Sequence, residues 1–479
     1  MSRLVVVSNR VELPQADDNG SRGGLSVAVL SSLRDDGGLW FGWSGEVSRG
    51  KASEPQVQQV GPVTYATADL SARDYDEFYA GFANSVLWPL FHYRLDLTDF
   101  TRRDMAGYER VNALFARRLQ PLLQPDDVIW VHDYHFIPFC RYLRQAGCRQ
   151  RIGFFLHIPW PSTQVLLALP NHRSLVRALL DYDLVGLQTE GDQASLFDYI
   201  ETEAGGRVSG DGIVEAYGGR AMVKAFPISI DTARIPRMAA AAVRGAKAAR
   251  LRASVRNRRL IIGVDRLDYT KGLLERLEAY QYFLQRYTEQ QGKVVFLQIA
   301  QPSRTDVDEY ANIRQEVQSA AGQLNGEFAE FDWTPCRYLN RGIDRNTLMG
   351  FLRLSDIGLI TPLRDGMNLV AKEFVAAQAE QDPGVLVLSR FAGAAAELDG
   401  ALVVNPYDIE GVGEALLRGL TMPLEERRER WTSMMRRLRH WDVYAWRDAF
   451  LDTLRTVRTT GAVALGGQPP SASPTPSPT

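Results

Sequence analysis

Two cations that could hold a diphosphate follow an apolar segment in the second half of the chain. The segment 259–264 is short, continuous and aliphatic, which is typical of a buried parallel strand. Arg266 and Lys271 come next, at the expected mouth of the strand and the start of the following helix. Because two positive charges there would neutralise a departing diphosphate, we favour a functional role over a pair of ordinary surface cations.

A second strand-to-helix loop carries residues that fit a nucleotide sugar. The apolar run 356–361 leads into a loop with Asp365, and residues 369–378 form a predicted helix rich in Ala, Lys and Glu. The N–H groups and the dipole at a helix start attract phosphate. Glu373, about one turn inside, could accept hydrogen bonds from both ribose hydroxyls. The alternative is an ordinary corner with a Lys372–Glu373 salt bridge.

Side chains in the first half of the chain suit a sugar. Tyr79 and Trp88 lie in an aromatic-rich segment where most rings must be core, but these two have small and polar neighbours. Asp133 follows the apolar run 127–131 and could accept a hydrogen bond from a sugar hydroxyl. His157 ends a similar run, and by itself it is better explained as a buried core histidine.

A metal site is the main alternative around Asp133. His132 and His135 flank it, but no third ligand occurs at suitable spacing, and a strand end would not direct both rings to one point. The D-x-D triplets at 181–183 and 306–308 resemble those of metal-dependent glycosyltransferases, yet such triplets are frequent by chance among 57 acidic residues. We therefore predict neither a metal site nor a cofactor.

Further anion contacts are predicted where Gly and Arg residues follow strands. Arg10 lies at the carboxyl end of the apolar run 4–8, the ligand side of a parallel sheet. Gly23 and Gly24 open a predicted helix and would let the backbone approach an anion closely, although glycine pairs also mark many turns. Arg304 stands behind another apolar run.

The scaffold that must position these residues repeats a strand–helix alternation twice. With 479 residues, the chain exceeds what one hydrophobic core usually supports. An Ala- and Arg-rich connecting helix is expected over 232–259, between the two series. We therefore predict an α/β fold with two doubly wound Rossmann-like domains. The expected parts are residues 1–232, residues 233–440, a helix at 441–460 that packs back on the first domain, and a disordered tail at 461–479.

Composition excludes several classes of protein. The 55 basic and 57 acidic residues nearly cancel, so nothing suggests a nucleic-acid or membrane-surface protein. Cys140, Cys148 and Cys336 are few and odd in number, which favours reduced thiols and a cytoplasmic location. The chain enters an apolar strand at once, without a signal peptide, and no apolar run approaches the ~20 residues that span a bilayer.

Common motifs of other α/β enzymes do not occur. The sequence has no G-x-S-x-G elbow, which counts against an α/β-hydrolase. It also has no G-x-x-x-x-G-K-[ST] loop and no G-x-G-x-x-G after a strand, so a nicotinamide oxidoreductase is the weaker interpretation.

Several long motifs instead carry a resemblance to a known family. They are LVVVSNR, GGLWFGWSGE, NSVLWPLFHYRLDL, IWVHDYH, RIGFFLHIPWP, DRLDYTKG, TPLRDGMNLVAKE and FAGAAAEL. From about residue 4 to about residue 454, the chain resembles the trehalose-6-phosphate synthases. These are retaining, metal-independent glycosyltransferases with the GT-B architecture, in which two Rossmann-like domains face across a cleft. The resemblance implies transfer of glucose from UDP-glucose, or another nucleoside diphosphate glucose, to glucose 6-phosphate, giving α,α-trehalose 6-phosphate.

The resemblance also assigns residues to each substrate. The implied catalytic residues are Asp133, His157, Arg266, Lys271 and Asp365. The implied acceptor residues are Arg10, Tyr79, Trp88, Asp133 and Arg304, with the two arginines on the phosphate. The implied donor residues are Gly23, Gly24, His157, Arg266, Lys271, Ile343, Asp365, Gly366, Met367, Asn368, Leu369, Val370, Ala371, Lys372 and Glu373. The leaving phosphate would assist the incoming hydroxyl on the same face, so the protein would supply charge and positioning rather than a nucleophile.

Two departures and two alternatives accompany this interpretation. Ile343 stands where the family has phenylalanine near the donor base, which leaves the choice among UDP, GDP and ADP open. Arg390 stands where the family has an uncharged residue, and we expect it to act indirectly. The alternatives are another GT-B sugar-phosphate transferase, such as a glucosylglycerol-phosphate synthase, and a non-catalytic regulatory homologue. We also expect a homo-oligomer, either a dimer or a tetramer.

Overall fold

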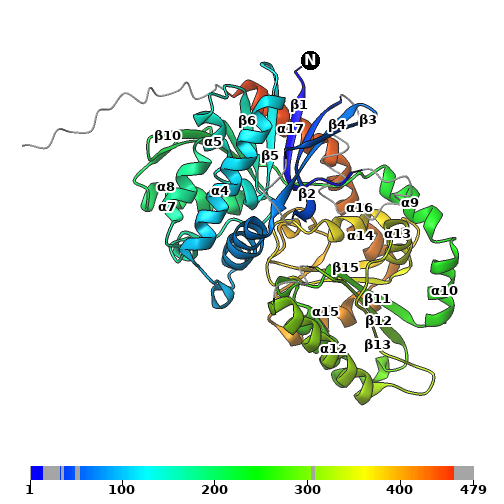
Figure 1. The fold of residues 1–479 in the computed structure, drawn as a ribbon. Helices are drawn as coiled ribbons and strands as arrows, with labels where there is room; N and C mark the ends of the chain where they lie inside the picture. The colour runs from blue at the N-terminus through cyan, green and yellow to red at the C-terminus, as the bar shows by residue number, and fades with distance from the viewer. Residues whose placement is uncertain (1, 14–32, 34–36, 49–53, 304–307, 458–479) are drawn as a thin grey trace, which may run out of the picture.

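Two sheets, one in each half of the chain, form the frame of the computed structural model (Figure 1). The structure describes residues 2–13, 33, 37–48, 54–303 and 308–457. Strands and helices alternate in both halves, and the central strands of each sheet run parallel. The expected α/β fold with two doubly wound sheets is therefore confirmed.

The N-terminal sheet has ten strands among the described residues, and β1 (Leu4–Arg10) lies inside it between β2 and β5. Its core is parallel, but β3, β8 and β9 pair antiparallel at its two ends. The other strands are β2 (Gly38–Ser48), β3 (Gln56–Val60), β4 (Val63–Ser71), β5 (Val128–His132), β6 (Arg151–Phe155), β7 (Leu184–Leu187), β8 (Arg207–Val208), β9 (Ile213–Ala216) and β10 (Gly219–Ala225).

Three helices of this half, α2, α4 and α8, begin at polar side chains that accept from free backbone N–H groups. Thr101 accepts from the Asp104 N–H at the start of α4, and Thr189 and Asp192 form a reciprocal capping box at the start of α8. A π-helix, η1, packs on α4. The bounds are α2 (Ala72–Asp74), η1 (Tyr75–Leu87), α3 (Trp88–Phe91), α4 (Arg102–Leu119), α5 (Phe139–Gln145), α6 (Thr163–Leu166), α7 (His172–Leu179) and α8 (Glu190–Thr202).

The C-terminal sheet is parallel throughout, in the order β13-β12-β11-β14-β15-β16. Its four central strands, β11, β12, β14 and β15, are almost wholly buried, which explains their continuous apolar runs. The strands of this sheet are β11 (Arg259–Arg266), β12 (Val294–Gln301), β13 (Cys336–Leu339), β14 (Ile357–Ile360), β15 (Val385–Ser389) and β16 (Leu402–Val404). The helices are α11 (Leu273–Arg286), α12 (Asp308–Phe328), α13 (Arg345–Leu354), α14 (Leu369–Ala377), α15 (Ile409–Thr421) and α16 (Leu424–His440).

The connection between the two sheets is a broken helix rather than the single helix expected over 232–259. It consists of α9 (Arg234–Ala242) and α10 (Ala246–Val255). Gly245 is extended, with φ −73° and ψ 159°, and it caps α10, so the chain turns between the two pieces. The alanine-rich composition correctly predicts helix, but it does not indicate the break at this glycine.

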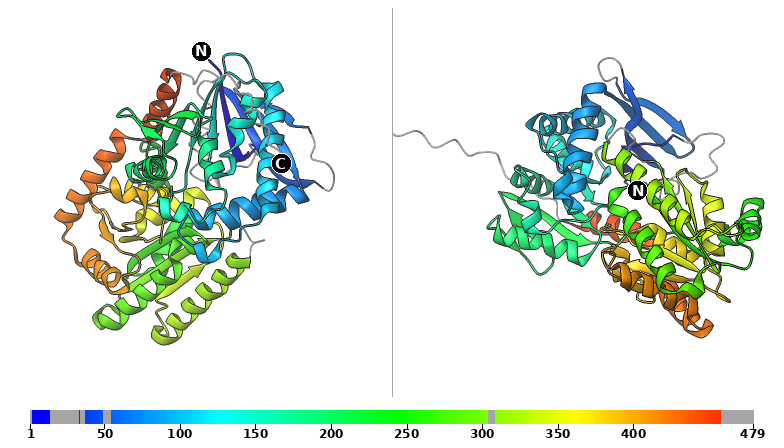
Figure 2. Two further views of the ribbon diagram at one scale, coloured as in Figure 1. Left: turned by 90° about the vertical axis from the view of Figure 1, so that its left-hand side faces the viewer. Right: turned by 90° about the horizontal axis from the view of Figure 1, so that it is seen from below.

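The last helix, α17 (Val443–Thr456), returns to the N-terminal sheet and packs on β6 and β7 (Figure 2). Phe450 stacks on Trp130 with 4.8 Å between ring centres. Gly153 and Gly186 make room for it, since an added Cβ at either position would lie 2.8 or 2.7 Å from the Phe450 ring. The C-terminal half is thus tied to the first sheet by aromatic packing.

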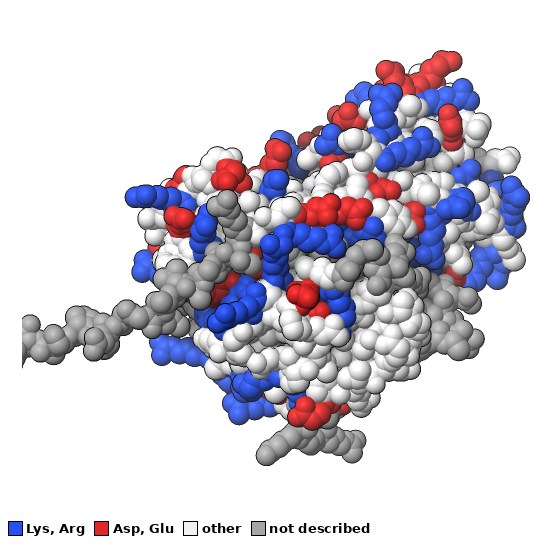
Figure 3. Space-filling model, turned by 90° about the horizontal axis from the view of Figure 1, so that it is seen from above, with Lys and Arg blue, Asp and Glu red and all other residues white. Residues whose placement is uncertain are grey.

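Surface charge is mixed on the face that Figure 3 shows, where acidic and basic side chains are interspersed. The cysteines Cys140, Cys148 and Cys336 are free and buried. Among the described helices, none combines the length and the apolarity that a membrane crossing requires.

Candidate active site

Three of the predicted site residues lie at the carboxyl ends of parallel strands. Arg10 ends β1, Arg266 ends β11, and Asp133 directly follows β5. Parallel strands bring such residues to one edge of each sheet, which is where α/β folds bind ligands.

The two edges meet at a contact region that we call the interdomain seam. The guanidinium carbon of Arg266, from the second sheet, lies 5.3 Å from the centre of the Trp88 ring, from the first half. The backbone of Gly366 lies against His157, so close that an added Cβ would be 2.2 Å from the His157 carbonyl oxygen. Residues predicted for the donor and for the acceptor therefore share one place.

Lys271 and Asp365 form a close ion pair on the C-terminal side of the seam. Their Nζ and Oδ2 atoms are 2.5 Å apart, and Asn368 donates to the same oxygen at 3.1 Å. Burial opposes the charge on Asp365, but the Lys271 ammonium and the Asn368 hydrogen bond act against burial, and the pKa of Asp365 is lowered. Lys271 is therefore a buried cation held beside a carboxylate, and an arriving diphosphate would compete for it.

A buried arginine that the sequence analysis did not identify supports Lys271. Arg276 has a fully buried side chain and donates to Asp265 at 2.7 Å, to Gln298 at 2.9 Å and to the Lys271 carbonyl at 3.1 Å. These bonds fix the backbone that carries Lys271. Arg276 lies inside a helix and outside the motifs of the sequence, so nothing in the sequence indicates this role.

The start of α14 is the place where the sequence predicts an anion-binding corner. Asn368 caps the helix with φ 75°, and its Oδ1 accepts from the Ala371 N–H at 3.0 Å. The N–H groups of Leu369 and Val370 belong to the first turn, where no intrahelical acceptor exists. Met367 is buried beneath the loop. This corner could therefore offer backbone N–H groups to a phosphate.

Glu373 is buried in α14 and pairs with a partner that the sequence did not indicate. Nη2 of Arg345 lies 2.5 Å from its Oε1. Burial raises the pKa of Glu373, and the charge of Arg345 opposes that shift. Ile343, the predicted neighbour of the donor base, lies two positions before Arg345 and is half-buried. Arg345 thus holds one carboxylate oxygen, and the ribose contact of Glu373 stays a prediction.

The Lys372–Glu373 salt bridge considered from the sequence is wrong. The Lys372 ammonium is fully buried and lies 2.5 Å from Glu397 and 2.7 Å from the Ile228 carbonyl of the N-terminal half. Adjacent residues point to different sides of a helix, so neighbouring opposite charges do not pair. Only the backbone of Lys372 is left to contact a donor, and its side chain ties the two halves together.

Glu397→Gln is expected to destabilise the protein by about 3 kcal/mol, because it leaves the Lys372 ammonium buried without its counter-charge. Thermal unfolding of the full chain measures the change. The matched control is Arg418→Gln, which removes the exposed pair with Glu426 at 3.5 Å, and it should cost no more than about 0.5 kcal/mol. Equal midpoints for the two variants would contradict a structural role for Lys372.

On the N-terminal side, Asp133 and His157 are held together. Asp133 has φ 76°, a left-handed conformation that is uncommon outside glycine, and its Oδ1 accepts from the His157 backbone N–H at 3.2 Å. The His157 ring is half-buried, and its Nε2 lies 3.0 Å from Nδ1 of His132. Burial lowers the pKa of His157 to about 3, so the ring is neutral at pH 7.

The predicted acceptor side chains come from three separate segments. Tyr79 is half-buried and stacks on His135 with 6.0 Å between ring centres. Trp88 is buried under Arg266. The Arg10 guanidinium lies along β2, where an added Cβ at Gly45 would be 2.8 Å from its Nη2. Gly23, Gly24 and Arg304 lie outside the described residues.

Arg364 is a further residue of the seam to which the sequence analysis gave no role. It donates to the Phe91 carbonyl at 3.2 Å and to the Trp160 carbonyl at 3.0 Å, and it lies 3.9 Å above the Tyr93 ring. It therefore anchors the loop that carries Asp365 to the N-terminal half. Every residue has a backbone carbonyl, so a sequence does not show which carbonyls accept from an arginine. Only the position next to Asp365 could have indicated this role.

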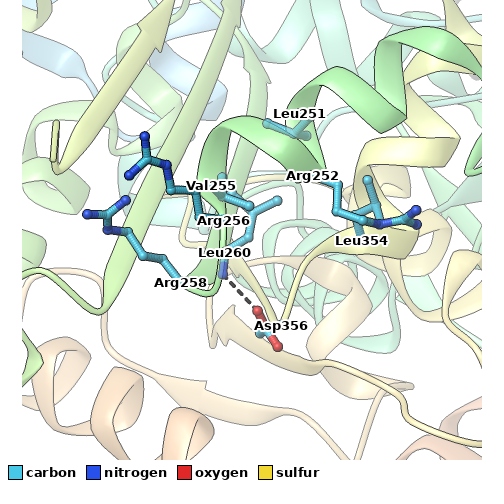
Figure 4. A pocket seen from close by; sticks show the side chains of 8 residues that line it. All are labelled: Leu251, Arg252, Val255, Arg256, Arg258, Leu260, Leu354 and Asp356. Atoms are coloured by element: carbon cyan, nitrogen blue, oxygen red, sulfur yellow. Dashed lines mark hydrogen bonds between the residues drawn. The ribbon is translucent and has the colours of Figure 1, made fainter. Parts of the chain in front are cut away.

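No cluster of three or more metal-ligating side chains occurs in the part of the chain that the structure describes. A pocket of ≈ 150 Å³ lies between α10 and the first residues of β11 and β14, lined by Leu260, Asp356 and several arginines (Figure 4). It sits at the amino ends of the strands, opposite the edge that carries Arg266. This pocket is therefore separate from the candidate active site.

Comparison with known proteins agrees with this geometry. The family model for glycosyltransferase family 20 matches residues 2–456. The chain is 51% identical over 456 residues to the trehalose-6-phosphate synthase of Sinorhizobium fredii, covering 95% of this chain and 98% of that protein. It is 49% identical over 457 residues to the trehalose-6-phosphate synthase of Klebsiella pneumoniae, covering 95% and 96%.

Solved structures show the same similarity. The α,α-trehalose-phosphate synthase (UDP-forming) of Burkholderia xenovorans, in complex with glucose-6-phosphate, has a TM-score of 0.92 and 51% identity, covering 95% of this chain and 100% of that one. An E. coli structure bound with UDP-2-fluoro glucose has a TM-score of 0.90 and 46% identity, with coverage of 95% and 100%. The expected GT-B fold and family resemblance are confirmed, and the chain belongs to glycosyltransferase family 20.

Proposed function

We propose that this chain transfers glucose from UDP-glucose to glucose 6-phosphate and forms α,α-trehalose 6-phosphate and UDP. The observation that carries the proposal is the contact of Arg266 with Trp88, which joins the predicted diphosphate and acceptor sites. The relatives support it, since one solved structure holds glucose-6-phosphate and another holds UDP-2-fluoro glucose.

The reaction requires stabilisation of a departing diphosphate. The bond from C1 of glucose to the diphosphate oxygen breaks, a bond from C1 to the acceptor hydroxyl oxygen forms on the same face, and the hydroxyl proton passes to the leaving phosphate. Arg266, Lys271 and the first N–H groups of α14 lie where they could balance the growing negative charge. No side chain has to form a covalent intermediate.

The remaining residues position the two sugars. Asp365 would accept from donor hydroxyls once the diphosphate engages Lys271, its present partner at 2.5 Å. His157 would contact the same sugar from the other half, since Gly366 and His157 touch across the seam. Fixing both sugars at reacting distance lowers the entropic part of the barrier.

Arg10→Ala and Arg304→Ala are expected to raise KM for glucose 6-phosphate by at least about tenfold, because each removes a charge-assisted contact to the acceptor phosphate. KM for UDP-glucose should stay nearly constant. Arg149→Ala, at an exposed position of the N-terminal half, is the control and should change neither value. A two-substrate titration measures both, and equal weakening of the two substrates would contradict the assignment.

A donor and acceptor panel with product identification tests the function directly. UDP release that requires glucose 6-phosphate, with α,α-trehalose 6-phosphate as product, is the expected result. Release with a different acceptor, such as glycerol 3-phosphate, would favour a glucosylglycerol-phosphate synthase. The absence of any transfer would favour a regulatory homologue. Comparing UDP-, GDP- and ADP-glucose addresses the base next to Ile343.

A cytoplasmic location and a homo-oligomer, either a dimer or a tetramer, belong to the same proposal. Free, buried thiols at Cys140, Cys148 and Cys336 support a reducing compartment. Light scattering of the purified chain tests the oligomeric state.

A further inference from the structure

Behind His157 lies a second histidine to which the proposed reaction gives no part. His132 ends β5 with 0% of its surface exposed. Its Nδ1 lies 3.0 Å from Nε2 of His157, with 5.3 Å between the ring centres and 29° between the ring planes. A neutral imidazole has one N–H and one bare nitrogen, so this single bond fixes the tautomers of both rings together.

The side chains packed against the His132 ring are aromatic, and its Nε2 is buried. Its ring contacts Trp130, with 4.5 Å between centres, and Trp446 of α17 lies against Trp130 at 5.0 Å. Among the described residues, His132 Nε2 has no hydrogen-bond partner, and neither have the indole nitrogens of Trp130 and Trp446. These three buried ring nitrogens do not bond to one another either, so a hydrogen on His132 Nε2 would be a buried N–H without an acceptor among the described residues.

Two arrangements of the hydrogen bond are conceivable. If His157 donated from Nε2, His132 would carry its own hydrogen on Nε2 and add another buried N–H without an acceptor. If His132 donates from Nδ1, its Nε2 keeps only an unused lone pair. Buried N–H groups without acceptors are rarer and costlier than under-used acceptors, which favours the second arrangement. His157 then accepts with Nε2 and carries its hydrogen on Nδ1.

The charge states agree with this assignment. Burial lowers the pKa of His132 well below its usual range, and burial lowers the pKa of His157 to about 3. Neither ring therefore takes up a second hydrogen at neutral pH, and each keeps one tautomer. The backbone of His157 is already fixed, because its N–H donates to Asp133 and its carbonyl lies against Gly366.

We propose that His132 is a positioning residue that sets the tautomer of His157, so that the Nδ1–H of His157 is a fixed hydrogen-bond donor to a hydroxyl oxygen of the donor hexose. The identity of that hexose rests on the proposed function, whereas the tautomer does not. α17 contributes to this arrangement, since its Trp446 helps to enclose the histidine pair.

The tautomer can be measured without activity. Nitrogen-15 labelling of the six histidines in the full chain, with long-range nitrogen–proton correlation spectra, shows which ring nitrogen carries the hydrogen. The signals of the pair are assigned by their change in His132→Asn. Hydrogen on Nδ1 of both His132 and His157 is expected. Hydrogen on Nε2 of His157 would overturn the proposal.

Two substitutions separate tautomer control from simple packing. The amide nitrogen of Asn is attached to Cγ, as Nδ1 is in histidine, so His132→Asn can still donate to His157, while His132→Phe fills the space without donating. We expect His132→Phe to lower kcat/KM for UDP-glucose about tenfold with KM for glucose 6-phosphate unchanged, and His132→Asn to stay within about threefold of the original chain. Equal losses in both variants, or an equal loss for both substrates, would overturn the proposal.

A set of deoxy-hexose donors locates the hydroxyl. The original chain should lose activity with the one nucleotide sugar that lacks the hydroxyl contacted by His157. His132→Phe should show no additional loss with that nucleotide sugar. An additional loss of the same size in the variant would overturn the proposal. If the original chain transfers no glucose from UDP-glucose at all, the proposed function fails, and the labelling experiment still decides the tautomer.

Discussion

Arg266→Ala is expected to lower kcat by about 10²–10³, with little change in the thermal unfolding midpoint. Arg266 is exposed at the end of β11 and touches Trp88 across the seam, so its removal leaves no buried cavity and no buried charge. Its charge is needed most when the diphosphate leaves, because negative charge then accumulates on the phosphate oxygens. A loss that appears in the transition state alone lowers kcat and kcat/KM together.

The control for Arg266 is an arginine that is equally exposed but distant from the seam. Arg418 on α15 pairs only loosely with Glu426, and Arg418→Ala should keep both kcat and stability. Initial-rate kinetics with saturating glucose 6-phosphate, together with thermal unfolding, measure the outcome. If Arg266→Ala lost activity and stability in parallel, its role would be structural.

Much of the frame could be predicted because it depends on local patterns. The parallel strands are continuous apolar runs, and each ends in a polar residue such as Arg10, Asp133 or Arg266. Those two features indicate where ligands bind in an α/β fold, so the strand ends can be identified from the sequence without knowledge of tertiary contacts. The antiparallel ends of the first sheet were not predicted, because β3 is exposed and polar and β8 has only the residues Arg207–Val208.

The supporting residues could not be predicted, because their partners are distant in the chain. Arg276 meets Asp265 and Gln298 inside the second sheet, and Arg364 meets backbone carbonyls of the first half. Neither residue lies in a motif whose spacing implies its partner. The pairing of Glu373 with Arg345 is likewise set by the packing of α14 against α13 and not by sequence distance.

The seam explains why so many site residues stand beside glycine. Gly366 lies against the His157 carbonyl, and Gly393 lies against the Gly366 carbonyl, where an added Cβ would be only 2.0 Å away. The loop that carries Asp365 and Gly366 is thus in backbone-to-backbone contact both with the 3-10 turn η7 (Gly393–Ala396) and with the N-terminal half. Distances in the site therefore depend on the absence of side chains as much as on the charged groups.

Gly366→Ala is accordingly expected to lower kcat by about 10², because the new Cβ would lie 2.2 Å from the His157 carbonyl oxygen and must push Asp365 and His157 apart by about 1 Å. The control is Gly322→Ala in α12, where an added Cβ meets nothing within 4 Å, and that change should be neutral for activity and slightly stabilising. Rates for both variants, with donor and acceptor saturating, measure the difference. Full activity in Gly366→Ala would mean that the two halves can separate by this distance without consequence, and that the close contact at the seam is not part of the catalytic geometry.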